Sequence, residues 1–246
     1  MCGAKGGCAR TGASNLDGVT APERTGLVLQ HGEDGPPARF ADWCERRGID
    51  YAISRVWAEE LPADPGEFGW ICSLGSEHTP GTRDAPAWVE AEIGFLRRAL
   101  DADVPILGLC FGGQALASAA GGTVGPAEPA EVGWIPITSS VPEAIPEGPW
   151  LHFHYDQLAL PPGAVEIARS SAGPAAFRLG RHLGLQFHPE ATPAIADAWA
   201  RMEADRISHL GTSPERVAEQ GRRDGATAAA AAERLFDAWW GSLNSA

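Results

Sequence analysis

No long apolar run occurs in this 246-residue sequence. A helix that crosses a membrane needs roughly 20 consecutive apolar residues, and no window of the chain approaches that length. The opening segment MCGAKGGCAR carries charge, but no apolar stretch of the kind found in secretory signals follows it. We therefore expect no membrane association and a cytoplasmic location.

Basic residues are scarce. Lys and Arg number 19 against 32 Asp and Glu, which gives a formal net charge of -13 at pH 7. Proteins that bind nucleic acid nonspecifically hold the phosphate backbone mainly through clustered Lys and Arg. The charge therefore argues against nucleic-acid partners and favours small molecules or other proteins.

Paired cysteines are also missing. Cys2, Cys8, Cys44, Cys72 and Cys110 form an odd set without a CxxC pair, which fits neither a disulfide framework nor a common zinc site. Cys44 lies in the predicted helix ARFADWCERRG and Cys72 in the apolar run GWICSLGS, so both are expected to be small buried residues. Cys110 needs a separate explanation.

The chain divides into a short leader and one domain. Residues 1–24 are rich in Gly, Ala, Ser and Thr without periodicity, which predicts a disordered leader. In residues 25–246, apolar runs alternate with helical patterns as far as Gly122, and extended segments separated by Pro and Gly follow. This order predicts an α/β fold with an open, mostly parallel central sheet flanked by helices. We expect it to be flavodoxin-like, with added antiparallel strands in the second half and a C-terminal helical extension.

Two segments have the spacing of amphipathic helices. In the first, APAWVEAEIGFLRRALDA, we expect Asp84 as the N-cap and Pro86 in the first turn. Its core-facing positions are predicted to be Val89, Ile93, Leu96 and Leu100. The tail TAAAAAERLFDAWWGSL is expected to pack on the body through Leu235, Phe236, Trp239 and Trp240.

Cys110 falls where the predicted strand VPILGLC meets the predicted helix FGGQALASAAGG. This is the nucleophile-elbow position, at the carboxyl end of the sheet where open α/β folds bind ligands. Gly108, Gly112 and Gly113 would allow the sharp turn, and the helix N-terminus would favour the thiolate. The alternative is a buried structural cysteine whose neighbouring glycines only serve packing.

A cysteine nucleophile needs a base and a group that orients the base. In LGLQFHPE, an apolar strand ends at His188, and Glu190 follows two residues later. His188 can accept the thiol proton, and Glu190 can hold the imidazole in the required tautomer. In isolation the same residues could form a strand-end turn with solvated polar side chains.

Together, GLCFGGQ and the distant QFHPE resemble the triad-type class I glutamine amidotransferases, especially stand-alone proteins similar to the amidotransferase domain of GMP synthetase. The resemblance extends from about Thr25 to Glu190. It implies that Cys110 attacks the glutamine side-chain amide to form a γ-glutamyl thioester. His188 would protonate the departing ammonia and later activate water, with Glu190 orienting it.

The resemblance also implies an oxyanion hole and substrate contacts. SLGSEHTPGTRD is similar to the family's glycine-rich oxyanion loop, so amides near Gly75 would join that of Phe111. The usual Gly-Gly-Pro is replaced here by Leu74-Gly75-Ser76. The expected substrate-contacting residues are Ser76, Gln114, His154, Tyr155 and Asp156.

No metal or other cofactor is expected. His152 and His154 form a His-x-His pair, but the sequence supplies no third ligand at ligand spacing. The N-terminal MCG resembles another amidotransferase class, in which Met removal exposes a catalytic cysteine. The apolar strand that this class needs directly after the cysteine is missing.

Three functions remain open from the sequence. The chain has neither a P-loop nor an SGGxD-type pyrophosphatase loop, so we do not expect it to activate an acceptor with ATP. It could be a glutaminase that supplies ammonia to a separate synthetase, or a stand-alone hydrolase or transferase of γ-glutamyl compounds. A regulatory module without enzymatic activity on the same fold is the third hypothesis.

Overall fold

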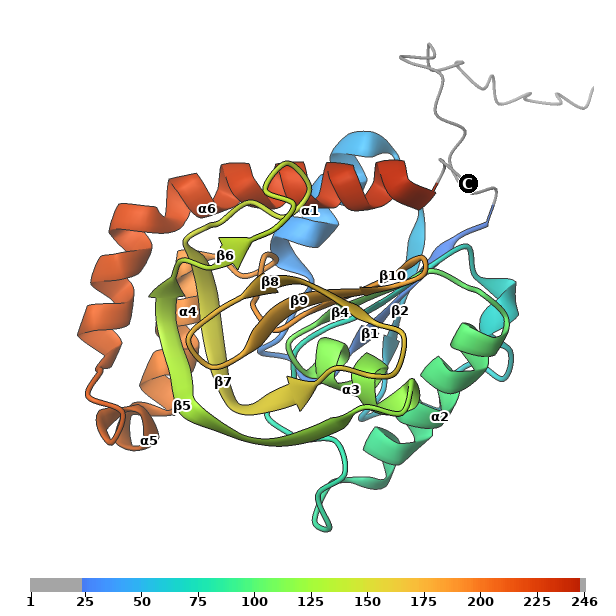
Figure 1. Ribbon diagram of the computed structural model, residues 1–246, viewed down its shortest axis with the longest axis horizontal. Coiled ribbons are helices and arrows are strands. Elements are labelled where there is room, and N and C mark those ends of the chain that lie inside the picture. The colour runs from blue at the N-terminus through green and yellow to red at the C-terminus, as the bar shows by residue number, and fades with distance from the viewer. Residues whose placement is uncertain (1–23, 244–246) are drawn as a thin grey trace, which may run out of the picture.

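The computed structural model describes residues 24–243. The predicted leader and the MCG segment lie outside these residues. The centre of the fold is an eight-stranded sheet with the order β2-β1-β3-β4-β10-β9-β8-β6 (Figure 1). Its strands are β1 Gly26–Gln30, β2 Tyr51–Arg55, β3 Ile71–Ser73, β4 Ile106–Leu109, β6 Thr138–Ser139, β8 Val165–Arg169, β9 Pro174–Leu179 and β10 His182–Leu185.

The sheet is parallel from β2 to β10 and antiparallel beyond it. The first five strands in space, β2-β1-β3-β4-β10, have the flavodoxin-like order, whose carboxyl ends form the usual ligand site. The predicted fold class is therefore confirmed, including the antiparallel addition in the second half.

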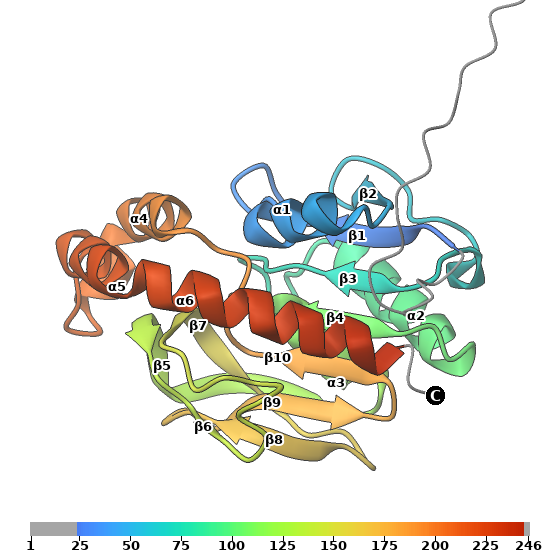
Figure 2. The same cartoon turned by 90° about the horizontal axis from the view of Figure 1, so that it is seen from above.

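Helices cover both faces of the sheet. On one face lie α1 (Ala38–Arg47) and α6 (Pro214–Leu243), and Figure 2 shows α6 running across the sheet. On the other face lie α2 (Ala87–Asp101) and α3 (Phe111–Ala119). Cys44 and Cys72 are buried in the core under α1 and α6, as predicted. The same core confirms the packing of the tail through Leu235, Phe236, Trp239 and Trp240.

Helix α6 begins at Pro214, well before the Thr227 at which the sequence pattern placed it. Gly221 and Gly225 interrupt the apolar pattern, yet both lie inside the helix. A Cβ built on Gly225 would stand 2.6 Å from Cγ of Pro193, and one on Gly221 would stand 3.1 Å from its Cβ. These glycines therefore allow close packing against α4 (Pro193–Met202) and do not end the helix.

The predicted N-cap of α2 is wrong. Pro86 occupies the cap position with extended backbone, and no side chain caps the helix. Asp84 lies three residues before the first helical residue, Ala87, which is too far for a cap side chain to reach the first free amides. The predicted inward face is confirmed, because Val89, Ile93 and Leu96 are buried and Leu100 packs against the same core.

A second, two-stranded antiparallel sheet joins β5 (Thr123–Ile135) to β7 (Trp150–Ala159). Its residues Trp134 and Leu151 share a small core with α4 and α6. The remaining short helices are η1 Pro65–Glu67 and α5 Ala204–Ser208. In residues 24–243, no helix is both long and apolar enough to cross a membrane.

Candidate active site

Cys110 stands on a sharp turn between β4 and α3. Its φ is 51° and its ψ is -105°, a backbone conformation that non-glycine residues rarely adopt. A Cβ on Gly108 would lie 2.4 Å from the carbonyl oxygen of Gly112, so the turn closes tightly on itself. The structure thus places Cys110 at the predicted elbow.

The other two glycines of the elbow allow α3 to approach neighbouring strands. A Cβ on Gly112 would stand 2.0 Å from the carbonyl oxygen of Ser73 in β3. A Cβ on Gly113 would stand 2.3 Å from that of Leu185 in β10. Side chains at these positions would displace the helix that carries the thiol, so the local sequence and the position of Cys110 depend on each other.

The Cys110 thiol faces a pocket, unlike the other described cysteines. Its Sγ lies 3.8 Å from Nε2 of Gln186 and 3.9 Å from the carbonyl oxygen of Phe153. Burial raises the pKa of Cys44 to about 12 and holds that of Cys72 well above its usual value. Of these thiols, only Cys110 is placed to react with a ligand in the pocket.

His188 and Glu190 form a buried pair that faces the same site. His188 Nδ1 lies 2.7 Å from Glu190 Oε1, and both side chains are 4% exposed. β10 ends at Leu185, three residues before the His188 at which the sequence placed the strand end. The His188 amide donates to the Leu151 carbonyl at 2.8 Å, which ties the segment after β10 to β7. Burial alone would lower the pKa of His188, but the charges of Cys110 and Glu190 outweigh it and raise this pKa to about 10. This raised pKa favours the imidazolium form of His188 at neutral pH.

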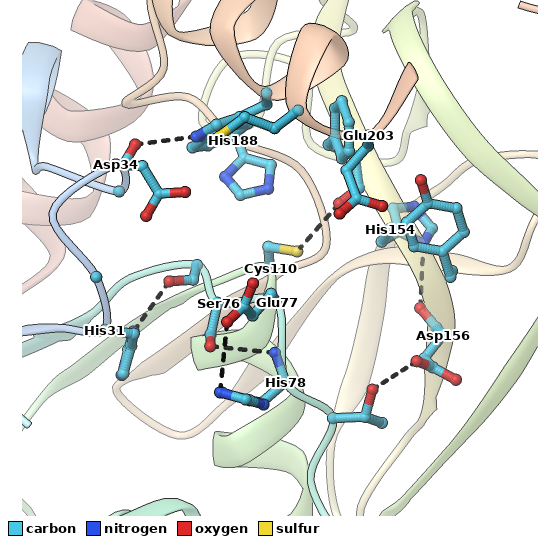
Figure 3. Close-up of a pocket in the computed structure, with 18 of the residues that line it drawn as sticks. His31, Asp34, Ser76, Glu77, His78, Cys110, His154, Asp156, His188 and Glu203 are labelled. Atoms are coloured by element: carbon cyan, nitrogen blue, oxygen red, sulfur yellow. Dashed lines mark hydrogen bonds and ion pairs between the residues drawn. The ribbon is translucent and has the colours of Figure 1, made fainter. Parts of the chain in front are cut away.

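The pocket in front of Cys110 gathers most of the residues that the sequence singled out (Figure 3). Cys110 and His188 both line it. Glu190 and Phe111 are buried behind the pocket wall, and the Phe111 amide lies in the first turn of α3, where a helix has no acceptor for it. The other predicted residues that line the pocket are Gly75, Ser76, Gln114, His154, Tyr155 and Asp156.

The predicted substrate-contacting residues are held by bonds between elements. Gln114 Nε2 of α3 donates to the Asp156 carbonyl of β7 at 3.0 Å and to Gln186 Oε1 at 3.3 Å. Thr79 Oγ1 donates to Asp156 Oδ2 at 2.6 Å. The pocket floor is therefore cross-linked between α3, β7 and the loop after β3.

Gly75 lies directly against the imidazole of His188. A Cβ at this position would stand 2.6 Å from Cε1 of His188. The preceding residue, Leu74, is buried in the core, and its carbonyl accepts from the Gly112 amide at 2.9 Å. Within Leu74-Gly75-Ser76, the central glycine is thus the residue whose missing side chain makes room for the histidine.

Glu131 of β5 is the centre of a buried polar cluster below the pocket. Its Oε2 lies 3.1 Å from Nδ1 of His152 and 3.2 Å from Nε2 of His154. Burial alone would raise the pKa of Glu131, but these bonds and one from Ser171 outweigh it and hold the pKa well below its usual range.

The structure brings Glu131 to His152 and His154 across the β5–β7 ladder, a third potential ligand that spacing in the sequence did not indicate. The three ligand atoms lie within 4.8 Å of one another and could hold a metal ion. The carboxylate already accepts hydrogen bonds from Ser170, Ser171 and the Ala172 amide besides the histidines. Hydrogen bonds thus satisfy the carboxylate of Glu131, whereas the buried Nε2 of His152 has no hydrogen-bond partner.

Several residues of the site were not predicted from the sequence. Gln186 lies within QFHPE, and its contact with the thiol could have been suspected from that motif. His31 directly follows β1, and the carboxyl end of a parallel strand is itself a signal for a site residue. Trp199 of α4 packs edge-on against His188 with ring centroids 4.9 Å apart, and no sequence signal indicated it.

The fold and this geometry define an α/β protein with a cysteine at a nucleophile elbow, and comparison with known proteins gives its family. Residues 78–200 match the family model "Glutamine amidotransferase class-I". The chain is 30% identical over 169 residues to the putative glutamine amidotransferase-like protein YfeJ of Salmonella typhimurium. The aligned region covers 62% of this chain and 70% of that protein. The chain therefore belongs to the class-I glutamine amidotransferase family.

Two further relatives agree with this assignment. The glutamine-hydrolyzing GMP synthase of Thermomicrobium roseum is 36% identical over 184 residues, which cover 67% of this chain and 31% of that protein. The chain thus matches only about a third of the length of that synthase. A glutamine amidotransferase structure from Methylobacillus flagellatus has a TM-score of 0.78 at 25% identity, covering 89% of this chain and 95% of the other.

Proposed function

We propose that this protein hydrolyses the side-chain amide of glutamine through a γ-glutamyl thioester on Cys110, with His188 and Glu190 completing a triad. The observation that carries the proposal is the elbow cysteine in one pocket with a His188 that is held by a buried Glu190. The family assignment supports the same chemistry.

In the first half-reaction, the Cys110 thiolate attacks the amide carbon of glutamine and a tetrahedral oxyanion forms. The His188 imidazolium then gives its proton to the nitrogen, the C–N bond breaks, and ammonia leaves a thioester. Amides at Gly75 and Phe111 would stabilise the oxyanion. The raised pKa of His188 suits this role, because the ring holds the proton at neutral pH.

In the second half-reaction, the neutral His188 takes a proton from water, and the resulting hydroxide attacks the thioester. Collapse of the second tetrahedral intermediate breaks the C–S bond, which restores the thiolate and releases the side-chain carboxylic acid. The acid loses its proton to solvent to give glutamate, and His188 keeps the proton taken from water as the imidazolium. Glu190 accepts the Nδ1 hydrogen throughout, so Nε2 is the nitrogen that exchanges protons. We assign glutamine binding to Ser76, Gln114, His154, Tyr155 and Asp156, which line the pocket.

We further propose that the ammonia is used by a separate synthetase. The matched GMP synthase is named as glutamine-hydrolyzing, which supports the coupling of glutamine hydrolysis to a synthetase reaction. Purified protein should hydrolyse glutamine slowly alone and faster with its synthetase. Cys110→Ala should abolish hydrolysis in both conditions. A wild-type protein that hydrolysed neither glutamine nor any γ-glutamyl amide would contradict the proposal.

One observation favours hydrolysis of larger γ-glutamyl amides as a second candidate. The pocket continues past the triad to Trp199 and Met202 of α4, Arg206 of α5 and Glu203 between these helices, which leaves room for an amine substituent. A panel of γ-glutamyl amides tests this alternative. A kcat/KM more than about a hundredfold above that for glutamine, a difference of about 2.7 kcal/mol, would favour the second candidate over the first.

A further inference from the structure

A buried series of side chains leads from α2 to the loop at Gly75. Glu92 of α2 is fully buried and accepts a 2.6 Å hydrogen bond from Ser73 Oγ. Its Oε2 lies 2.7 Å from Nε2 of His31, and Nδ1 of His31 lies 3.0 Å from the carbonyl oxygen of Gly75. A carbonyl oxygen can only accept a hydrogen bond, so Nδ1 of His31 must carry a hydrogen. This holds whether the proton shared by His31 Nε2 and Glu92 lies on the imidazole or on the carboxylate. His31 therefore donates to Gly75.

Aromatic rings fix the imidazole of His31 from two sides. It stacks on Trp88 of α2 with ring centroids 5.2 Å apart, and it meets Phe111 edge-on at 4.7 Å. The side chain is 1% exposed. Phe111 follows Cys110, and its amide is one of the two expected oxyanion donors. His31 thus contacts both segments that would form the oxyanion hole.

The bond from His31 restricts a peptide that glycine would otherwise leave free to rotate. Peptide groups are planar and trans, so a fixed Gly75 carbonyl also fixes the Ser76 amide on the opposite side. The peptide before Gly75 is held in the same way, because the Leu74 carbonyl accepts from the Gly112 amide at 2.9 Å. Both peptide planes that meet at Gly75 are therefore oriented by bonds to the rest of the protein.

We propose that His31, held in place by Glu92, is a positioning residue for the oxyanion hole. By donating to the Gly75 carbonyl, it fixes the peptide that follows Gly75, and so prevents rotation of the loop whose Gly75 amide would stabilise the tetrahedral intermediate. This inference rests on the proposed function, because the oxyanion arises when Cys110 attacks the amide of glutamine. His31 acts through the loop, and it neither attacks nor protonates the substrate.

Two substitutions at His31 separate its two bonds. Asn places its amide nitrogen near the position of Nδ1 and can still donate to Gly75, whereas Gln reaches toward Glu92 and leaves Gly75 without a donor. Both variants are made in a Glu92→Gln background, so that no buried charge loses its partner. His31→Gln should lower kcat by about 10- to 100-fold with little change in KM. The upper limit corresponds to the complete loss of one oxyanion donor, which costs about 100-fold or more in kcat. His31→Asn should retain most of the parent kcat.

Alkylation of Cys110 by iodoacetamide provides the control. This displacement forms no oxyanion, so both variants should be alkylated at the rate of the parent. An unchanged kcat in His31→Gln, or equal losses in both variants, would overturn the proposal. Loss of alkylation together with hydrolysis would also overturn it, because His31 would then act on the thiol or on the fold.

Backbone amide NMR gives a readout that does not depend on activity. The Gly75 and Ser76 resonances should be single in the parent and in His31→Asn, and broadened or doubled in His31→Gln. Unchanged resonances in His31→Gln would contradict the positioning role even if the wild type hydrolysed nothing. A wild type without turnover, combined with a mobile loop in His31→Gln, would contradict the proposed function alone.

Discussion

At the scale of single residues, the three described cysteines carry the same thiol, and their surroundings determine how each one reacts. Cys44 and Cys72 are packed in an apolar core that opposes ionisation. Cys110 stands at the N-cap of α3 and lines a pocket together with His188. Burial against apolar side chains suppresses the thiolates of Cys44 and Cys72, and only the Cys110 thiol, among these three, faces the pocket.

This contrast predicts selective labelling of one thiol. A chloroketone analogue of glutamine should modify Cys110 stoichiometrically, and peptide mapping should find Cys44 and Cys72 unmodified in the folded protein. Excess free glutamine should slow the labelling, because both compounds would occupy the same pocket. Label recovered mainly on Cys44 or Cys72 would show that Cys110 is not the nucleophile.

The raised pKa of His188 predicts the upper limb of the pH profile. The folded pKa of His188, about 10, lies above the ordinary value of 6.5. We therefore expect kcat/KM to fall as pH rises through about 10, because His188 then lacks the proton that it gives to the departing nitrogen. The same shift stabilises the fold fully below about pH 6.5, and this contribution is lost as pH rises toward 10.

Glu190→Gln provides the matching variant. Without the carboxylate charge, the upper limb of kcat/KM should move to lower pH. The rate should fall by up to about 10⁴-fold yet remain measurable, since the carboxylate orients and stabilises the base. A limb that stayed in place would mean that Glu190 does not contribute to the pKa of His188.

At the scale of elements, close packing explains where sequence periodicity misplaced a boundary. Gly221 and Gly225 lie inside α6 because α4 approaches the helix there through Pro193. A glycine in a sequence does not reveal whether it ends a helix or admits a neighbour. The element that packs against the glycine decides between these two outcomes, and that element comes from another part of the chain.

Paired glycine substitutions test this explanation. Gly225→Ala should destabilise the protein by about 1–3 kcal/mol, because a Cβ would stand 2.6 Å from Pro193. Gly94→Ala in α2 should instead stabilise it by about 0.5–1 kcal/mol, since the nearest atom to its new Cβ is a flexible Arg98 nitrogen at 3.9 Å. Urea unfolding of both variants measures the difference, and stabilisation by Gly225→Ala would contradict the packing argument.

At the scale of the whole molecule, Glu131 joins strands β5 and β7 to the segment after β8. It accepts hydrogen bonds from Ser170, Ser171 and the Ala172 amide as well as from the two histidines. His154 in turn lines the pocket. The second sheet is thus fastened to the first beside the pocket that His154 lines.

Removing the charge of Glu131 should weaken this connection in a pH-dependent way. Its folded pKa is depressed, so its contribution to stability is present above the ordinary value of about 4.5 and is lost as pH falls below it. Glu131→Gln should therefore lower the melting temperature at pH 7 and flatten its dependence on pH on the acid side. Exposed Glu143→Gln serves as the control and should leave both unchanged. A Glu131→Gln profile parallel to that of the wild type would contradict this role.

Short-range information in the sequence was sufficient for the parallel core, the helix faces and the elbow that carries Cys110. These follow from periodicity and from glycines within a few residues of the cysteine. The motif around His188 indicated the His188–Glu190 pair, because both residues lie on one short segment. What the tertiary structure decided is which distant side chains support these groups. Glu92 reaches Gly75 through His31, and Glu131 meets its histidines across a strand ladder, because chain topology brings together residues whose separation in sequence carries no periodic signal.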